Sequence, residues 1–233
     1  MKKFIHRDDV GDFEVPEIKI IDGKRFYVTP DGNSYPSITT VLSSQNKPSL
    51  EKWKKDVGEK EAKRISKDSM RIGTAVHQMA EFYLSNYVIK LKNEEKKIVD
   101  TFNRLRFLLG NINNIVGVEI PLFSDLLRVA GTTDCIAEYN GVLSVIDFKT
   151  SRKPKKEEWI DDYYMQTFAY KLMFEEMTGV EIKQVVILIA CVDQFDVQVF
   201  KKPASDSDKY LTKLIKIMKA NPHITGIMQQ PIF

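Results

Sequence analysis

Cysteine is scarce in this sequence, and its scarcity excludes one group of metal sites. The 233 residues include only two cysteines, Cys135 and Cys191. A four-cysteine zinc site or an iron–sulfur cluster needs more thiolates than that. Both cysteines fall in stretches that we expect to be strands, where a buried free thiol is the usual state. We therefore expect no iron–sulfur cluster.

Long apolar runs are also missing. No stretch approaches the ~20 consecutive apolar residues of a membrane-spanning helix. The N-terminal sequence MKKFIHRDDVGDFEV lacks the apolar centre of a signal peptide and carries too many acidic side chains for a transit peptide. We therefore expect no membrane contact and a cytoplasmic location.

A strong charge of one sign is absent as well. The sequence has 35 Lys and Arg residues against 32 Asp and Glu residues, a formal net charge of +3. Any basic surface for a nucleic acid must therefore be local. A hydrophobic content of 43% over 233 residues is enough for one sizeable core with a helical appendage.

Residues 129–150 contain a β-hairpin pattern with unexpected polar residues. Two apolar runs flank an Asn-Gly dipeptide at 140–141, which tolerates positive φ and favours a tight turn. Asp147 and Lys149 are two residues apart and point to the same face, and Asp134 can lie opposite or diagonal to them. Two carboxylates beside an ammonium suit a hard divalent cation that activates water next to a phosphate. An Asp-x-Lys triplet is also common in a solvated turn.

Residues 49–71 are expected to be helical and rich in basic side chains. Trp53 lies among these bases, so the segment is suited to follow a phosphate backbone and to stack a base on an aromatic face. Acidic residues share the segment, and mixed charge is equally typical of a solvated helix face. The basic residues are Lys52, Lys54, Lys55, Lys60, Lys63, Arg64, Lys67 and Arg71.

The next expected helix covers residues 69–86. Gly73, His77 and Glu81 recur at i, i+4 and i+8 and therefore share one face. A histidine in such a position is most often a buried core residue. It becomes a candidate ligand if its face meets Asp134 and the hairpin.

Other segments follow from apolar periodicity and turn residues. Residues 17–28 are expected to form a two-stranded flap with no chemistry of its own, and Ser37 is expected to cap a short helix. A later core strand carries Glu119, a weaker site candidate, and the basic loop after the hairpin carries Lys153. The expected ranges are strands at 115–122, 183–191 and 195–200, and helices at 38–42, 94–110, 157–178 and 206–220.

Gln166 and Tyr170 lie one helical turn apart on the helix at 157–178, so they share a face. Gly179 follows as the C-cap. The strand at 183–191 contains the run VVILIA, which is typical of a strand buried on both faces.

Four short motifs in order resemble the RecB-like exonuclease branch of the PD-(D/E)XK nuclease superfamily. They are G-x-x-x-H with a later Glu (Gly73, His77, Glu81), G-x-x-D (Gly131, Asp134), D-x-K-T (Asp147, Lys149, Thr150) and Q-x-x-x-Y (Gln166, Tyr170). The segment from Ser34 also looks like that of the mitochondrial genome maintenance exonuclease type. The likeness covers residues 34–190. It departs at Thr133, where the superfamily's nominal motif has proline.

The resemblance implies an α/β fold with a restriction-endonuclease-like core. This core would be a central mixed sheet of about four strands flanked by helices. We expect the nuclease core at residues 69–233. Residues 1–68 would add a flap and a basic helical segment.

The resemblance also implies roles for individual residues. Mg²⁺ or Mn²⁺ would be held by His77, Asp134, Asp147 and the carbonyl of Phe148. Catalysis would depend on Asp134, Asp147 and Lys149, with Lys149 orienting water and stabilising charge on phosphorus. Substrate would contact Trp53, Lys153, Gln166 and Tyr170. Glu81 would orient His77. Glu119, a candidate from its strand position and not from the resemblance, would support the site from behind the ligands or equally face solvent.

The function implied is that of a metal-dependent exonuclease that prefers single-stranded DNA with free ends. The expected source is a bacterium or a phage, with replication or recombination proteins as partners. Two alternatives stay open. One is an endonuclease of the restriction or junction-resolving kind, and the other is a DNA-binding recombination accessory protein without catalysis.

Overall fold

A five-stranded mixed sheet forms the centre of the protein, with strand order β4-β5-β6-β7-β8. The computed structural model describes residues 2–21, 24–45, 48–89 and 94–222. All neighbouring strands are antiparallel except β6 and β7, which are parallel. The strands are β4 (Ile112–Ser124), β5 (Val129–Tyr139), β6 (Val142–Ser151), β7 (Gln184–Cys191) and β8 (Val197–Pro203).

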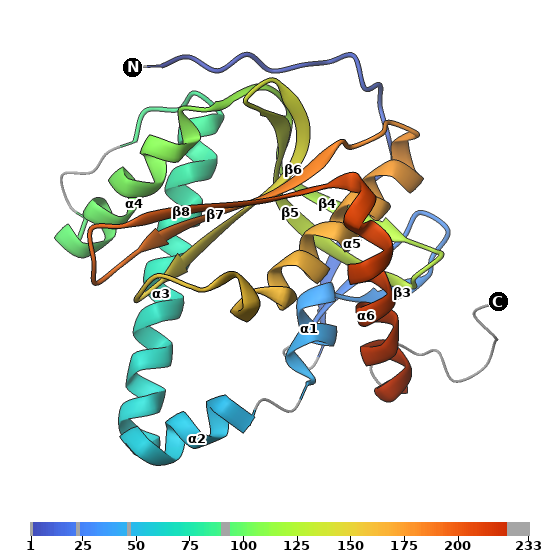
Figure 1. Cartoon of the computed structure of the whole chain (residues 1–233). Helices are drawn as coiled ribbons and strands as arrows, with labels where there is room; N and C mark the ends of the chain where they lie inside the picture. The colour runs from blue at the N-terminus through green and yellow to red at the C-terminus, as the bar shows by residue number, and fades with distance from the viewer. Residues whose placement is uncertain (1, 22–23, 46–47, 90–93, 223–233) are drawn as a thin grey trace.

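Helices cover both faces of this sheet (Figure 1). One face carries α3 (Glu59–Leu84) and α4 (Lys96–Leu109). The other carries α5 and α6, together with α1. The bounds of these three are Asp161–Thr178, Ser207–Ala220 and Ile38–Ser43, and the short 3-10 turns η1 and η2 cover Glu157–Trp159 and Ala204–Asp206.

Strand β7 shows why the sheet is buried on both sides. Its side chains alternate between the two cores: Val185, Ile187 and Ile189 pack toward α5, while Val186 and Leu188 pack toward α3 and α4. A strand with apolar residues on both faces needs a cover on each. This strand therefore fixes the three-layer arrangement, and the prediction of an α/β fold is confirmed.

A smaller sheet lies beside this core, with order β1-β2-β3. Its strands are β1 (Glu17–Ile21), β2 (Lys24–Val28) and β3 (Ser34–Pro36). Tyr27 and Tyr35 fix it to the core by packing on Ala130 of β5. The next residue, Ser37, caps α1 as predicted, because its hydroxyl accepts a hydrogen bond from the N–H of Thr40 (3.1 Å).

Three expectations need correction. The sheet has five strands rather than about four, because Val197–Pro203 pairs with Gln184–Ala190 of β7. The helix expected to begin at residue 69 is continuous from Glu59, since no residue in that stretch breaks a helix. The helix expected at 157–178 starts as the turn η1, and α5 begins only at Asp161.

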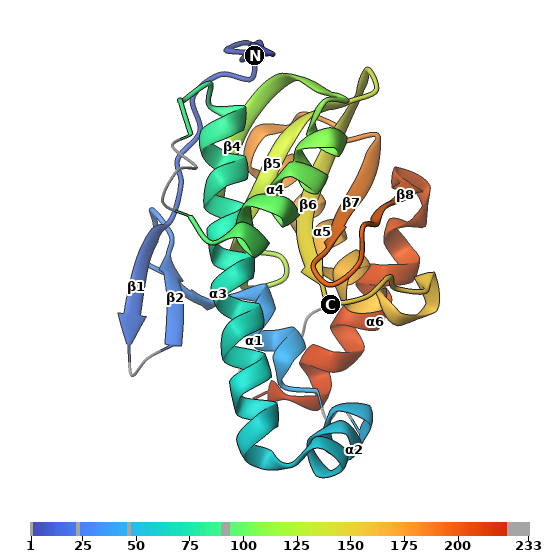
Figure 2. The same ribbon diagram turned by 90° about the vertical axis from the view of Figure 1, so that its left-hand side faces the viewer.

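The first half of α3 projects beyond the core together with α2 (Pro48–Val57), as Figures 1 and 2 show. Up to Arg71 the helix buries only Ala62, whereas its second half is buried at six positions. The basic segment therefore forms an arm on a continuous helix. The expected division after residue 68 falls inside α3, and this division stays a prediction.

Other predictions agree with the structure. Both cysteines are buried free thiols. Gly179 adopts the left-handed conformation (φ 72°) that ends α5. No helix among residues 2–222, leaving out the gaps given above, is long and apolar enough to cross a membrane.

Gly131 is a position of close approach between strand β5 and helix α5. A Cβ atom there would lie 2.7 Å from Cε1 of Tyr170 and 3.2 Å from Cγ2 of Ile38. Both neighbours are buried and closely packed, and Tyr170 is also held by its hydrogen bond with Gln166.

We predict that Gly131→Ala lowers the free energy of unfolding by about 1–3 kcal/mol, because the added methyl overpacks this contact. Denaturant unfolding without metal measures the change. Gly73→Ala is the matched control, since its Cβ would lie 3.3 Å from Oγ1 of Thr150 while the helix gains about 1 kcal/mol from alanine. Equal stability of Gly131→Ala and wild type would contradict this view of the contact.

Candidate active site

The site begins where strands β5 and β6 part. Their pairing ends at Cys135 and Ile146, one residue short of Asp134 and Asp147. Beyond that point the N–H of Phe148 donates a hydrogen bond to Oδ2 of Asp134 (2.6 Å) instead of to a strand carbonyl. In an antiparallel ladder the N–H and C=O of one residue point to the same side. The carbonyl of Phe148 is therefore directed toward the gap as well.

Three elements meet at Asp134. His77 comes from α3, and its Nδ1 lies 3.4 Å from Oδ1 of Asp134. Glu119 comes from β4, where Val118 pairs with Cys135 and Ile120 with Thr133, so that Glu119 lies across from Asp134.

Glu119 has a φ of 52°, an uncommon conformation for a residue with a side chain. The ligand atoms of His77, Glu119 and Asp134 all lie within 4.8 Å of one another. Within the part of the chain that the structure describes, they form a group able to hold a metal ion.

Asp147 and Lys149 form an ion pair directly beside this group. Nζ of Lys149 lies 2.7 Å from Oδ1 and 2.6 Å from Oδ2 of Asp147. Asp147 is only 1% exposed, and the ammonium lies 5.2 Å from the ring centre of Tyr163. The pair agrees with the same-face placement predicted from the two-residue spacing.

The protonation equilibria of the site reflect crowded acids in a buried place. Burial, reinforced by the charge of Asp134, raises the pKa of Glu119 to about 7. Burial also raises the pKa of Asp147 to about 6, in spite of Lys149. For His77, burial opposes protonation, but the carboxylate of Asp134 outweighs it and raises the pKa. Such a cluster is stabilised by a further positive charge.

A cavity of about 530 Å³ opens in front of these groups. The predicted residues that line it are His77, Glu81, Glu119, Asp134, Lys149, Gln166 and Tyr170. Asp147 and Phe148 are buried in the strand behind it. Nε2 of Gln166 donates a hydrogen bond to the hydroxyl of Tyr170 (3.1 Å), so these two act as one unit.

Two predicted substrate contacts lie away from the cavity. Trp53 is on α2, and Lys153 is an exposed residue in the loop after β6. Neither side chain lines the cavity. Their contact with substrate stays a prediction.

The structure adds cavity residues that the sequence did not indicate. Arg25, Tyr27, Ser37 and Thr39 line the cavity from the N-terminal segment. The flap was expected to have no chemistry of its own; this stays a prediction, although β2 supplies Arg25 to the cavity wall. Strand alternation indicates which residues share a face of the flap, but it gives no information about what that face meets.

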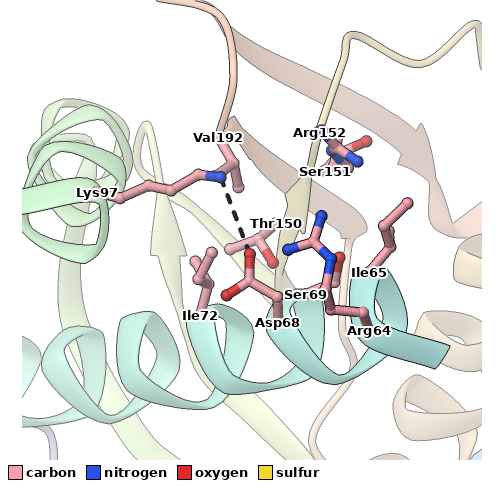
Figure 3. Close-up of a pocket in the computed structure, with 10 residues that line it drawn as sticks. All are labelled: Arg64, Ile65, Asp68, Ser69, Ile72, Lys97, Thr150, Ser151, Arg152 and Val192. Atoms are coloured by element: carbon pink, nitrogen blue, oxygen red, sulfur yellow. Dashed lines mark ion pairs between the residues drawn. The ribbon is translucent and has the colours of Figure 1, made fainter. Parts of the chain in front are cut away.

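A second, smaller cavity of about 120 Å³ lies between α3, the end of β6 and Lys97 of α4 (Figure 3). Thr150 borders it, while Gly73, next to Thr150, lines the larger cavity. Its basic side chains are neutralised by acids, so it has no excess charge for a phosphate. The ion pairs are Arg64–Glu61 (2.7 Å), Lys97–Asp193 (3.1 Å), Lys97–Asp68 (4.0 Å) and Arg152–Asp193 (2.6 Å).

Carboxylates, a histidine and a lysine at a break in a mixed sheet are suited to phosphodiester chemistry assisted by a divalent ion. A model of the PD-(D/E)XK nuclease superfamily matches residues 87–231, more than half of the chain. The chain therefore belongs to the PD-(D/E)XK nuclease superfamily, and the predicted family is confirmed.

Curated relatives narrow the comparison. Mitochondrial genome maintenance exonuclease 1 of Mus musculus is 31% identical over 131 residues, which cover 53% of this chain and 39% of the mouse protein. The Homo sapiens protein of that name is 31% identical over 132 residues, covering 53% of this chain and 38% of its own. The match thus spans about two fifths of the length of these relatives.

Among solved structures, a protein from Eubacterium rectale with a provisional exonuclease name superimposes with a TM-score of 0.48 and 12% identity. The superposition covers 70% of this chain and 69% of that one.

We predict that Glu119→Gln weakens Mn²⁺ binding at least about tenfold, because it removes a charged ligand atom from the group with His77 and Asp134. Titration calorimetry of the protein without DNA measures the affinity. Glu138→Gln is the matched control, since Glu138 lies on β5 outside the cavity and the substitution removes the same charge. Equal Mn²⁺ affinities of the two variants would contradict a role for Glu119.

Proposed function

We propose that this chain is a divalent-metal-dependent exonuclease that hydrolyses phosphodiester bonds of DNA and prefers single strands with free ends. The observation that carries the proposal is the parting of β5 and β6 at Asp134 and Asp147, with Lys149 fixed beside them and His77 and Glu119 opposite. Membership of a nuclease superfamily and likeness to relatives named exonucleases support it.

The donor atoms of the site fit Mg²⁺ or Mn²⁺. Carboxylate oxygens are the ligands that these hard ions favour, and an imidazole is compatible with Mn²⁺. His77, Asp134, Asp147 and the Phe148 carbonyl would hold the ion, and Glu119 joins the set because of its position. A bound ion would polarise the scissile phosphate and lower the pKa of a neighbouring water.

Lys149 has the role of a fixed positive charge. Asp147 holds its ammonium and raises its pKa against the effect of burial, so the group stays protonated at neutral pH. A fixed ammonium orients the attacking water and stabilises negative charge as it builds on the phosphoryl oxygens. Loss of such a group typically costs ~10²-fold or more in rate.

Gln166 and Tyr170 position the substrate from the α5 side of the cavity. Their hydrogen bond and the close contact between Tyr170 and Gly131 fix the phenol near Asp134. From α3, Glu81 lines the same cavity and orients His77. These residues position the DNA strand and take no part in the proton transfers.

The preference for single strands is supported by the projecting arm of α2 and the first half of α3. The arm carries the basic residues around Trp53, although Lys54, Arg64 and Arg71 are paired with acids. A flexible strand can follow such an arm by phosphate contacts and stacking. We infer that a strand enters the site past this arm end first, and a closed circle has no end with which to enter.

Location and partners stay predictions. The cytoplasmic location, the bacterial or phage source and the contacts with replication or recombination proteins rest on the sequence and its resemblance. The curated relatives carry the word mitochondrial in their names.

We expect end-labelled linear single-stranded DNA to be degraded to short products in Mg²⁺, while a circle of the same sequence survives. Duplex ends should be cut more slowly, and chelation of the metal should stop all cleavage. Lys149→Met, which keeps the apolar stem, should be at least about 10²-fold slower. Gel analysis of time courses measures these rates.

Rapid cutting of the circle would identify an endonuclease and contradict the need for an end. DNA binding without any cleavage by the wild type would favour the accessory-protein alternative. Near-normal activity of Lys149→Met would contradict the proposed site.

A further inference from the structure

The hairpin of β1 and β2 turns one face toward the active-site cavity. Ile18 pairs directly with Tyr27, and Ile20 with Arg25. Residues opposite each other in an antiparallel pair, and residues two apart along a strand, share a face. These four side chains therefore lie on one face, and the hydroxyl of Tyr27 marks its direction by bonding Oγ1 of Thr132 (3.1 Å).

The base of the hairpin is held firmly. Tyr27 is 1% exposed and packs with Tyr35 on Ala130. The hydroxyl of Tyr35 donates a hydrogen bond to Asp125. Figure 2 shows the hairpin on one side of α3, with α4 on the other side.

Arg25 adds a positive charge to this wall of the cavity. Its side chain is exposed, lines the cavity and forms no ion pair with another described residue. Lys149, the other Lys or Arg among the cavity-lining residues, is held by Asp147. Arg25 lines the same cavity as His77, Glu119 and Asp134, so its guanidinium and the metal-ligand group border one space.

Two apolar side chains flank this arginine on the same face. Ile20 is 67% exposed and Ile18 is 44% exposed. Exposed branched aliphatic side chains next to a guanidinium make a surface that complements a nucleic-acid strand, since the cation suits the anionic backbone and the apolar groups suit base and sugar faces.

We propose that Arg25 binds a backbone phosphate next to the scissile one, and that Ile18 and Ile20 contact the adjoining base or sugar. The guanidinium fork matches two phosphate oxygens. The hairpin is thereby a substrate-binding wall of the cavity. This inference rests on the proposed nuclease function and adds a subsite to it.

The test compares Arg25→Ala and Arg25→Lys with Lys19→Ala. Lys19 is the matched control because it lies on the opposite face of the same hairpin, where it pairs with Glu17 (3.2 Å). Initial rates on short linear single-stranded DNA are measured at several salt concentrations, together with DNA binding by fluorescence anisotropy in chelator. Melting temperatures verify that all variants are folded.

For Arg25→Ala we expect KM to rise about tenfold, as for the loss of a charged hydrogen bond, with kcat changed less than about threefold. The slope of log affinity against log salt should fall by about 0.7, the value for one phosphate contact on a single strand. Arg25→Lys should keep the salt slope, and Lys19→Ala should match wild type.

The inference would be overturned if Arg25→Ala had the same KM and salt slope as Lys19→Ala. In that case, cleavage of DNA by the wild type would still support the nuclease function. A fall in kcat with unchanged KM would also overturn it, since binding would not depend on Arg25. A wild type that binds DNA through Arg25 but cuts nothing would overturn the nuclease proposal and keep the role of the hairpin.

Discussion

The site depends on the separation of two neighbouring strands. Strands β5 and β6 stop pairing after Cys135 and Ile146, and the side chain of Asp134 takes the place of a backbone acceptor for Phe148. This one hydrogen bond pairs the backbone N–H of Phe148, which would otherwise be buried without an acceptor. It also fixes the orientation of the carboxylate and leaves the gap where Lys149 lines the cavity, with Asp147 buried directly behind it.

Around this gap the protein buries acidic groups, and burial, followed by repulsion from Asp134, raises the pKa values of two of them. The pKa values of Glu119 and Asp147 lie near 7 and 6, well above those of free carboxyl groups. Glu119 also has a left-handed backbone conformation, which costs on the order of 1–3 kcal/mol. Strain and repulsion at the same place are typical of a functional site, and a divalent cation would relieve the repulsion.

Much of this could be predicted from the sequence, because local patterns carry it. The Asn-Gly turn, the spacing of Asp147 and Lys149 and the apolar run of β7 indicated the central strands and two of the site residues, and motif order indicated the family. The place of Glu119 depends on the register of β4 against β5, and the place of Arg25 on how the small sheet docks through Tyr27. Register and docking arise from packing between distant segments, which no local pattern specifies.

The central claim is that the parted strands form a divalent-metal site, and anomalous X-ray diffraction from crystals containing Mn²⁺ tests it most directly. We predict one strong anomalous peak within coordination distance of His77, Glu119 and Asp134, on the side of Asp147. A peak elsewhere with none at this site, or no peak at a Mn²⁺ concentration that supports cleavage, would contradict the account.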